Sequence, residues 1–278
     1  MTTRAYPGIA ELKNMLMIRK EIEKKEREAS SLGFFQKSRK AALEREVQEL
    51  KKRMETTRQR IIGFHYPYDH PIMLAAKDPD SISFGRLTAE ESASRDVILW
   101  QLIDVVDNKA LLLSRYALFT TTFHSFCEDV TYEDSTVRGI LNEECFNGWF
   151  SPEERKRIEL QSVLTGENSD PGDSQVHTMD YLFLLSEKEA KEYLFPGRLS
   201  CQGLDLLADG FQGIDACVCW WLRTPGESLI YRKYVTPDGH IDIDGTMVDQ
   251  TRTGSGSFAT DVNFDVYVRP AMWIRLAD

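Results

Sequence analysis

Side chains suited to molecular recognition gather in the C-terminal third of this 278-residue chain. Tyrosine, arginine and asparagine combine rigid contact area with hydrogen bonding, which favours them in binding surfaces. Here they stand in or beside two loops, residues 224–233 and 246–265, that contain glycine, serine and threonine. We therefore predict a site at these loops for an unknown protein or small ligand, formed by Tyr231, Arg232, Tyr234, Arg252, Phe258, Asn263 and Tyr267.

An alternation of aspartate and isoleucine within residues 238–245 raises the question of calcium binding. An EF-hand loop needs oxygen ligands at alternate positions and a glutamate at the twelfth. Counted from His240, which offers no oxygen ligand, the twelfth residue is Thr251. The alternation instead predicts a strand with one apolar and one polar face.

His65, Asp69 and His70 are the other candidate metal ligands. No further ligand at a suitable spacing accompanies them, and the prolines among them are typical of a linker. We therefore predict no metal site and no other cofactor.

Nucleophilic and phosphate-binding motifs give no support for an enzyme. Neither a G-x-S-x-G elbow between a strand and a helix nor a phosphate-binding glycine loop is present. Cys217 and Cys219 would share one face of an extended strand. We interpret both as small side chains of a strand, and an oxidase built on this pair is the function ranked last.

Composition limits the class of protein. Apolar residues make up 42% of the chain, enough for a core. Apolar runs are far shorter than the roughly 20 residues of a membrane-spanning helix, and the first residues do not resemble a signal peptide. Five cysteines without a C-x-x-C pair predict reduced thiols. We expect a cytoplasmic protein without membrane contact.

Charge divides the chain into two parts. Residues 1–62 hold 16 Lys and Arg against 9 Asp and Glu, a net charge of +7, so the remainder carries −17. This basic part also has helical periodicity, which predicts a hairpin of two helices with the first ending at Gly33 and the second capped by Ser38.

Two apolar stripes define the faces of these helices. The first is Met15, Ile18, Ile22, Ala29 and Leu32, and the second is Leu43, Val47, Leu50, Met54, Thr57 and Ile61. We expect a lone hairpin to leave both stripes uncovered, so that they pack on the rest of the chain or on other copies. Self-association through the hairpin is therefore the alternative function, and nucleic-acid contact is disfavoured because opposite charges are interspersed and aromatics are absent.

Residues 63–79 read as a linker and residues 80–278 as an α+β domain. Strands are predicted at 82–85, 97–105, 110–114, 181–185, 219–223, 234–235, 240–244 and 266–268. A turn at 107–109 joins two of them into a hairpin. Ser135 or Asp134, Ser151 and Ser186 are the predicted caps of three helical segments, the last two with a glutamate at the third position typical of a capping box.

A series of short motifs runs through this domain in a characteristic order. The motifs stand at residues 83–86, 99–104, 110–114, 134–138, 141–142, 150–154, 183–186, 189–190, 220–226, 237–239 and 268–273. Over residues 80–276 their order and spacing resemble a bacterial domain family of unknown function, and Trp-Trp-Leu-Arg at 220–223 with Val-Arg-Pro-Ala-Met-Trp at 268–273 is the most specific part. The hairpin lies outside the resemblance.

The resemblance implies a C-type-lectin-like fold, as in formylglycine-generating enzymes and retroelement-diversified variable proteins. It implies scaffold positions for Trp220, Trp221, Arg223, Arg269 and Trp273. The sugar-binding motifs of calcium-dependent lectins and the cysteine pattern of formylglycine-generating enzymes are absent. The resemblance therefore favours a non-enzymatic binding protein, with sequence diversity expected at the loop residues named above.

Overall fold

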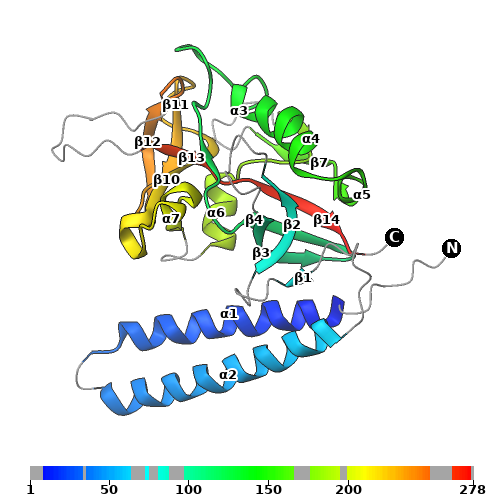
Figure 1. Cartoon of the computed structure of the whole chain (residues 1–278). Helices are drawn as coiled ribbons and strands as arrows, with labels where there is room; N and C mark the ends of the chain where they lie inside the picture. The colour runs from blue at the N-terminus through cyan, green and yellow to red at the C-terminus, as the bar shows by residue number, and fades with distance from the viewer. Residues whose placement is uncertain are drawn as a thin grey trace.

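A computed structural model describes residues 9–33, 36–63, 73–74, 81–87, 97–165, 176–194, 199–250 and 265–276. The fold is α+β, as predicted: a hairpin of two long helices precedes a strand-rich body (Figure 1). Most of the predicted linker, including His65, Asp69 and His70, lies outside the described residues. Within the described part, no helix is both long and apolar enough to cross a membrane.

The hairpin consists of α1 (Ile9–Ser31) and α2 (Lys37–Gly63). Helix α1 ends just before Gly33, as predicted, whereas α2 begins at Lys37, so Ser38 lies inside the helix rather than capping it. Ile18, Ile22, Val47 and Leu50 are buried together between the two helices.

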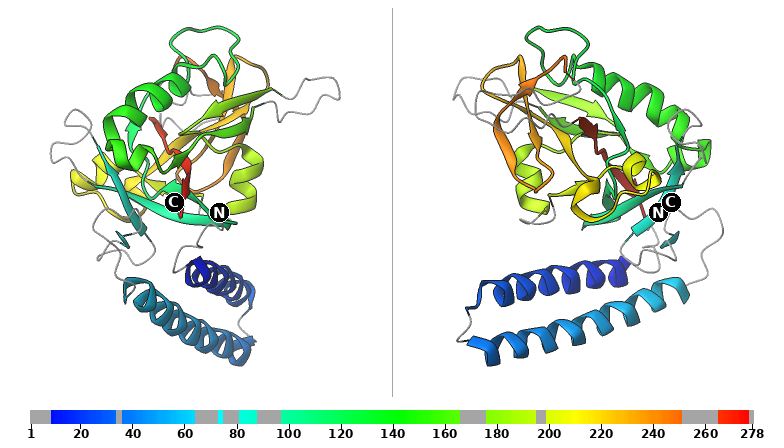
Figure 2. Two further views of the ribbon diagram at one scale, coloured as in Figure 1. Left: turned by 90° about the vertical axis from the view of Figure 1, so that its right-hand side faces the viewer. Right: turned by 60° about the vertical axis from the view of Figure 1, so that its left-hand side comes forward.

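The middle parts of the two stripes thus cover one another, contrary to expectation, whereas Met15 and Met54 pack on the core of the body, as expected. The reason is that the stripes face each other across the antiparallel pair instead of both facing outward. Helix α1 lies nearer the body (Figures 1 and 2). There Met15 joins the core of the body, and the Arg19 guanidinium donates a hydrogen bond to the Leu102 carbonyl.

One sheet of the body has the order β1-β2-β3-β4-β14-β6. Its strands are β1 (Met73–Leu74), β2 (Ser81–Arg86), β3 (Val97–Val106), β4 (Lys109–Ser114), β14 (Ala271–Arg275) and β6 (Ile158–Glu159). Strands β3 and β4 form the predicted hairpin, with Asp107 at a positive φ of 50° in the turn. Strand β14 pairs with β4, so the end of the domain lies inside the sheet.

A second sheet has the order β12-β11-β10-β13-β5, with β9 paired to β10. Its strands are β12 (Ile241–Met247), β11 (Tyr231–Val235), β10 (Cys217–Pro225), β13 (Val266–Val268), β5 (Phe119–Thr120) and β9 (Cys201–Gln202). Strand β10 is buried on both faces: Cys219 and Trp221 join one apolar cluster, and Val218, Trp220 and Leu222 join the other. A separate pair is formed by β7 (Gln161–Leu164) and β8 (His177–Asp180).

Short helices connect the strands. They are α3 (Thr136–Gly139), the π-helical turn η2 (Ile140–Cys145), α4 (Phe146–Trp149), α5 (Pro152–Arg155), α6 (Glu187–Tyr193), α7 (Leu204–Ala208) and the 3₁₀ turn η3 (Gly213–Ala216). The predicted caps are confirmed: Ser135 caps α3, and Ser151 and Ser186 form capping boxes with Glu154 and Glu189.

Residues 181–185 do not form the predicted strand. Side chains replace a partner strand along most of this segment: Asn142 Oδ1 accepts hydrogen bonds from the amides of Tyr181 and Leu182, at 2.7 and 3.2 Å. The Tyr132 hydroxyl accepts from the Leu184 amide at 3.3 Å. A single bridge, Phe183 to Ala271, joins the segment to β14. The segment is therefore mostly buried and has its amides satisfied without belonging to a sheet.

Candidate functional site

The predicted binding residues fall into three groups. Arg252, Phe258 and Asn263 lie outside the described residues. Tyr231, at the start of β11, is half-buried. Arg232, Tyr234 and Tyr267 are buried. Among the predicted binding residues that the structure describes, Tyr231 is therefore the one that is partly exposed to solvent.

Arg232 is wholly buried beneath the loops. Its guanidinium donates to the carbonyls of Arg223 and Val130, at 3.0 and 2.5 Å, and lies 4.4 Å from the centre of the Phe123 ring. Burial away from water lowers the pKa of Arg232 to about 9. The side chain thereby joins strand β10 to the loop before α3, a supporting role that leaves no surface for a ligand.

Tyr234 and Tyr267 support the same sheet. Their hydroxyls donate to Asp242 and Asp205, at 3.1 and 3.0 Å. Burial first, and the neighbouring carboxylates second, raise the pKa of both phenols. These tyrosines therefore link strands to adjacent segments and do not present their rings to solvent.

Three segments around Tyr231 form a continuous edge that we call the loop rim: residues 123–136, 226–231 and 241–250. Backbone hydrogen bonds connect them, from His124 to Val248 at 2.8 Å, from Val130 to Leu229 at 3.4 Å and from Glu227 to Asp244 at 3.1 Å. The rim lies at the end of the body away from the helical hairpin (Figures 1 and 2).

The rim carries large apolar side chains that are exposed to solvent. Phe126 is 66% exposed, Leu229 41% and Ile243 65%. One exposed apolar residue is ordinary, and three on segments joined by backbone hydrogen bonds make the rim our candidate interaction surface. Sequence analysis missed Phe126 and Leu229 because neither stands in a periodic segment. Ile243 was read as part of an apolar strand face, which the structure instead turns to solvent.

The first rim segment is closed at its base like an Ω-loop. The Ser125 amide donates to Thr136 Oγ1 at 3.0 Å, and the Val137 amide donates to the Phe123 carbonyl at 3.1 Å. Phe126 therefore projects from a loop whose two ends are fixed together.

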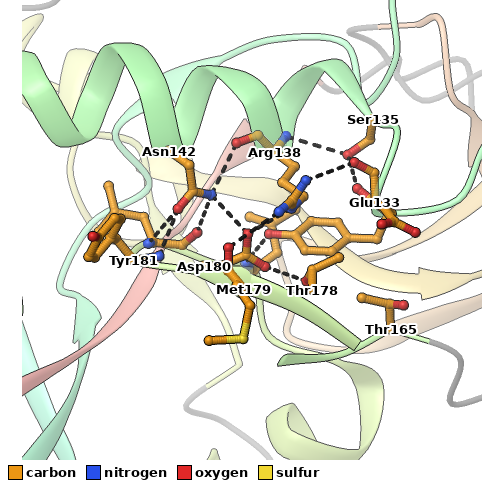
Figure 3. A network of polar contacts seen from close by, with 12 residues as sticks. Glu133, Ser135, Arg138, Asn142, Thr165, Thr178, Met179, Asp180 and Tyr181 are labelled. Carbon is orange, nitrogen blue, oxygen red and sulfur yellow. Dashed lines mark hydrogen bonds and ion pairs between the residues drawn. The ribbon is translucent and has the colours of Figure 1, made fainter. Parts of the chain in front are cut away.

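A polar network fixes the far end of this segment (Figure 3). The buried carboxylate of Asp180 accepts from Arg138 Nε at 2.7 Å and from Thr178 Oγ1 at 2.5 Å. The same arginine donates to the Glu133 carbonyl at 3.0 Å. Because Asp180 belongs to β8 and Arg138 to α3, the network attaches the loop to the body beneath it.

Two glycines allow the other rim segments to approach closely. A Cβ on Gly226 would lie 2.1 Å from the Asp244 carbonyl oxygen, and one on Gly245 would lie 2.7 Å from that of Arg232. Gly245 also has a φ of +85°, which favours glycine. The rim geometry thus depends on both residues.

The cysteine pair on β10 lacks the features of a reactive dithiol. Cys219 is buried, and burial raises the pKa of its thiol to about 12. Cys217 is half-buried and accepts a hydrogen bond from Ser200 Oγ at 3.2 Å. Since the thiolate is the nucleophile, Cys219 is poorly suited to attack at neutral pH.

The Cys219 pKa predicts a pH dependence of stability. The folded state keeps the thiol proton up to about pH 12, whereas the unfolded chain loses it near pH 9. The contribution of the protonated Cys219 thiol to the stability of the folded state is complete below pH 9 and is lost as the pH rises toward 12. We expect this thiol to lower the free energy of unfolding by about 1 kcal/mol between pH 8 and pH 10.

Urea unfolding at pH 8, 9 and 10 measures this effect. The variant Cys219→Ala should be less stable at every pH but should lose less stability with rising pH than the wild type. Equal pH slopes for the two proteins would contradict the assignment.

The structure thus defines a helical hairpin joined to an α+β body with an apolar loop rim. A family model described as a domain of unknown function (DUF6273) matches residues 107–276, more than half of the chain. The chain therefore belongs to the DUF6273 family, which agrees with the expected domain family of unknown function. The match begins at the β3–β4 turn and leaves the hairpin outside. No curated protein and no solved structure matches the chain.

Proposed function

We propose that this protein is a non-enzymatic binding protein whose body captures a partner at the loop rim. The observation that carries the proposal is the exposure of Phe126, Leu229 and Ile243 on segments fixed by backbone hydrogen bonds and by buried side chains. Preorganised loops lose little conformational entropy on binding, so their apolar area contributes to affinity.

The C-type-lectin-like class and diversification by a retroelement belong to the same proposal. The rim contains Tyr231, and the segment with Arg252, Phe258 and Asn263 directly follows Gln250 at its edge. A nearby near-copy of this DNA segment that differs mainly at adenines would support diversification, and its absence would remove that part alone.

The structure of the hairpin supports the alternative function, self-association, less than the loop rim supports partner binding. Its apolar stripes are already covered within one chain, and its surface charges are partly paired, as in Lys25–Glu46 at 2.6 Å and Lys51–Glu26 at 2.9 Å. Such a surface is typical of a solvated helix pair.

Selection from a random-peptide display library against the immobilised full chain tests the binding function. We expect the enriched peptides to bind the wild type and to lose at least tenfold in affinity with Phe126→Ala combined with Leu229→Ala. The matched control is Phe211→Ala, because Phe211 is also an exposed aromatic residue but lies beyond α7, outside the rim.

Both variants should nearly keep the unfolding midpoint of the wild type, since Phe126, Leu229 and Phe211 are 66%, 41% and 49% exposed. A library that yields no enriched peptide, or peptides bound equally by the rim variant, would refute the proposed site.

A further inference from the structure

The loop rim is acidic as well as apolar. Residues 123–136, 226–231 and 241–250 contain eight aspartates and glutamates and no lysine or arginine. The exposed members are Glu128, Asp129, Glu133, Asp134, Glu227 and Asp244. The adjacent Arg232 is buried, so its guanidinium is not available at the surface.

These carboxylates stand next to the exposed apolar residues. Asp129 directly precedes Val130, whose amide bonds to the Leu229 carbonyl. Glu227 bonds through its amide to the Asp244 carbonyl, beside Ile243. Exposed apolar and acidic residues are therefore neighbours on the bonded segments of the rim.

On the basis of the proposed function, we propose that the rim binds a positively charged peptide segment, rich in lysine or arginine, that also carries an apolar side chain. Opposite charge across an interface speeds encounter and suppresses wrong partners, while a central apolar anchor supplies most of the affinity. A phosphate backbone would meet repulsion along the whole rim.

A metal ion does not explain the same surface. Within the described residues, no group of three or more His, Cys, Asp or Glu side chains is placed to hold one. Asp242 is already engaged by the Tyr234 hydroxyl and the Gly245 amide, at 3.1 and 2.9 Å. A peptide uses both properties of the rim, because its cations meet the carboxylates while its apolar side chain meets Phe126.

The peptides from the display library supply the probe. We expect enrichment of lysine and arginine, and an affinity that falls at least tenfold between 50 and 300 mM NaCl. A variant with Asp129→Asn, Glu227→Gln and Asp244→Asn should bind the best synthetic peptide about tenfold more weakly by fluorescence anisotropy.

The control carries the same change in net charge outside the rim: Glu143→Gln, Glu144→Gln and Glu153→Gln, all at exposed positions. It should bind the peptide like the wild type. If the control weakens binding equally, net charge rather than the rim is responsible, and the inference fails.

Two further outcomes distinguish this inference from the proposed function. Neutral or acidic peptides that still depend on Phe126 would overturn the charge preference and keep the binding site. The full chain could instead associate with itself in a salt-sensitive way that the variant with Asp129→Asn, Glu227→Gln and Asp244→Asn abolishes. That result would identify the basic hairpin of a second copy as the occupant of the rim. It would overturn the proposal of a separate peptide partner.

Discussion

Replacing Arg223 by alanine is expected to lower the free energy of unfolding by about 3–5 kcal/mol. Arg223 is 1% exposed and forms a bidentate ion pair with Glu189 of α6. It also donates to the carbonyls of Leu164 and Leu184, at 2.9 and 2.7 Å. Removing the guanidinium would leave two buried carbonyls without this donor and the half-buried Glu189 carboxylate with only the Ser186 amide, which costs more than the pair contributes.

Urea unfolding measures the loss of stability in Arg223→Ala, and two further variants serve as controls. Arg39→Ala removes an arginine from the exposed pair Arg39–Glu28 and should cost under about 1 kcal/mol. Arg223→Met combined with Glu189→Met should recover part of the stability, because the carboxylate no longer lacks its arginine, whereas the capping bond to the Ser186 amide is lost as well. A loss below about 1 kcal/mol for Arg223→Ala would show that water replaces the ion pair.

The residues that sequence analysis placed correctly depend on short-range signals. Ser135, Ser151 and Ser186 each cap a helix through a backbone amide three residues away, so the motif contains its own partner. The β3–β4 hairpin is local in the same sense, since its turn and its flanking strands are adjacent in sequence.

Residues 181–185 show where such signals fail. An apolar run predicts a buried strand, and residues 182–185 are indeed buried. Whether the segment joins a sheet depends on Asn142 and Tyr132, about 40 and 50 residues earlier, whose side chains satisfy its amides. A pattern within five residues carries no information about these partners.

The candidate site was predicted by residue type, which does not distinguish a binding arginine from a buried one. Arg232 and Tyr234 are two residues apart on β11 and therefore share one face of the strand. Because Tyr234 belongs to the core, the same face buries Arg232. The alternation of side chains along a strand could have distinguished these two residues from Tyr231, which lies on the opposite face of β11. Phe126 stands in a loop without periodicity, so no such pattern predicts its exposure.

Gly245→Ala is expected to destabilise the protein by about 2–5 kcal/mol and to impair the loop rim. A left-handed backbone costs a non-glycine residue about 1–2 kcal/mol. The new Cβ would also lie 2.7 Å from the carbonyl oxygen and 2.8 Å from the carbonyl carbon of Arg232, and forcing backbone apart adds about 1–3 kcal/mol. Because Arg232 holds the loop through Val130, the displacement would reach the segment that bears Phe126.

Gly210→Ala separates the two contributions. Gly210 has a φ of +92°, close to that of Gly245, but a Cβ there would meet nothing within 4 Å. We expect Gly210→Ala to cost only about 1–2 kcal/mol in urea unfolding and to leave peptide affinity unchanged. Gly245→Ala should exceed that cost and should also weaken peptide binding at a temperature where the variant is still folded. Equal costs for the two substitutions would mean that β11 yields to the added methyl group, and the rim would then be softer than its hydrogen bonds indicate.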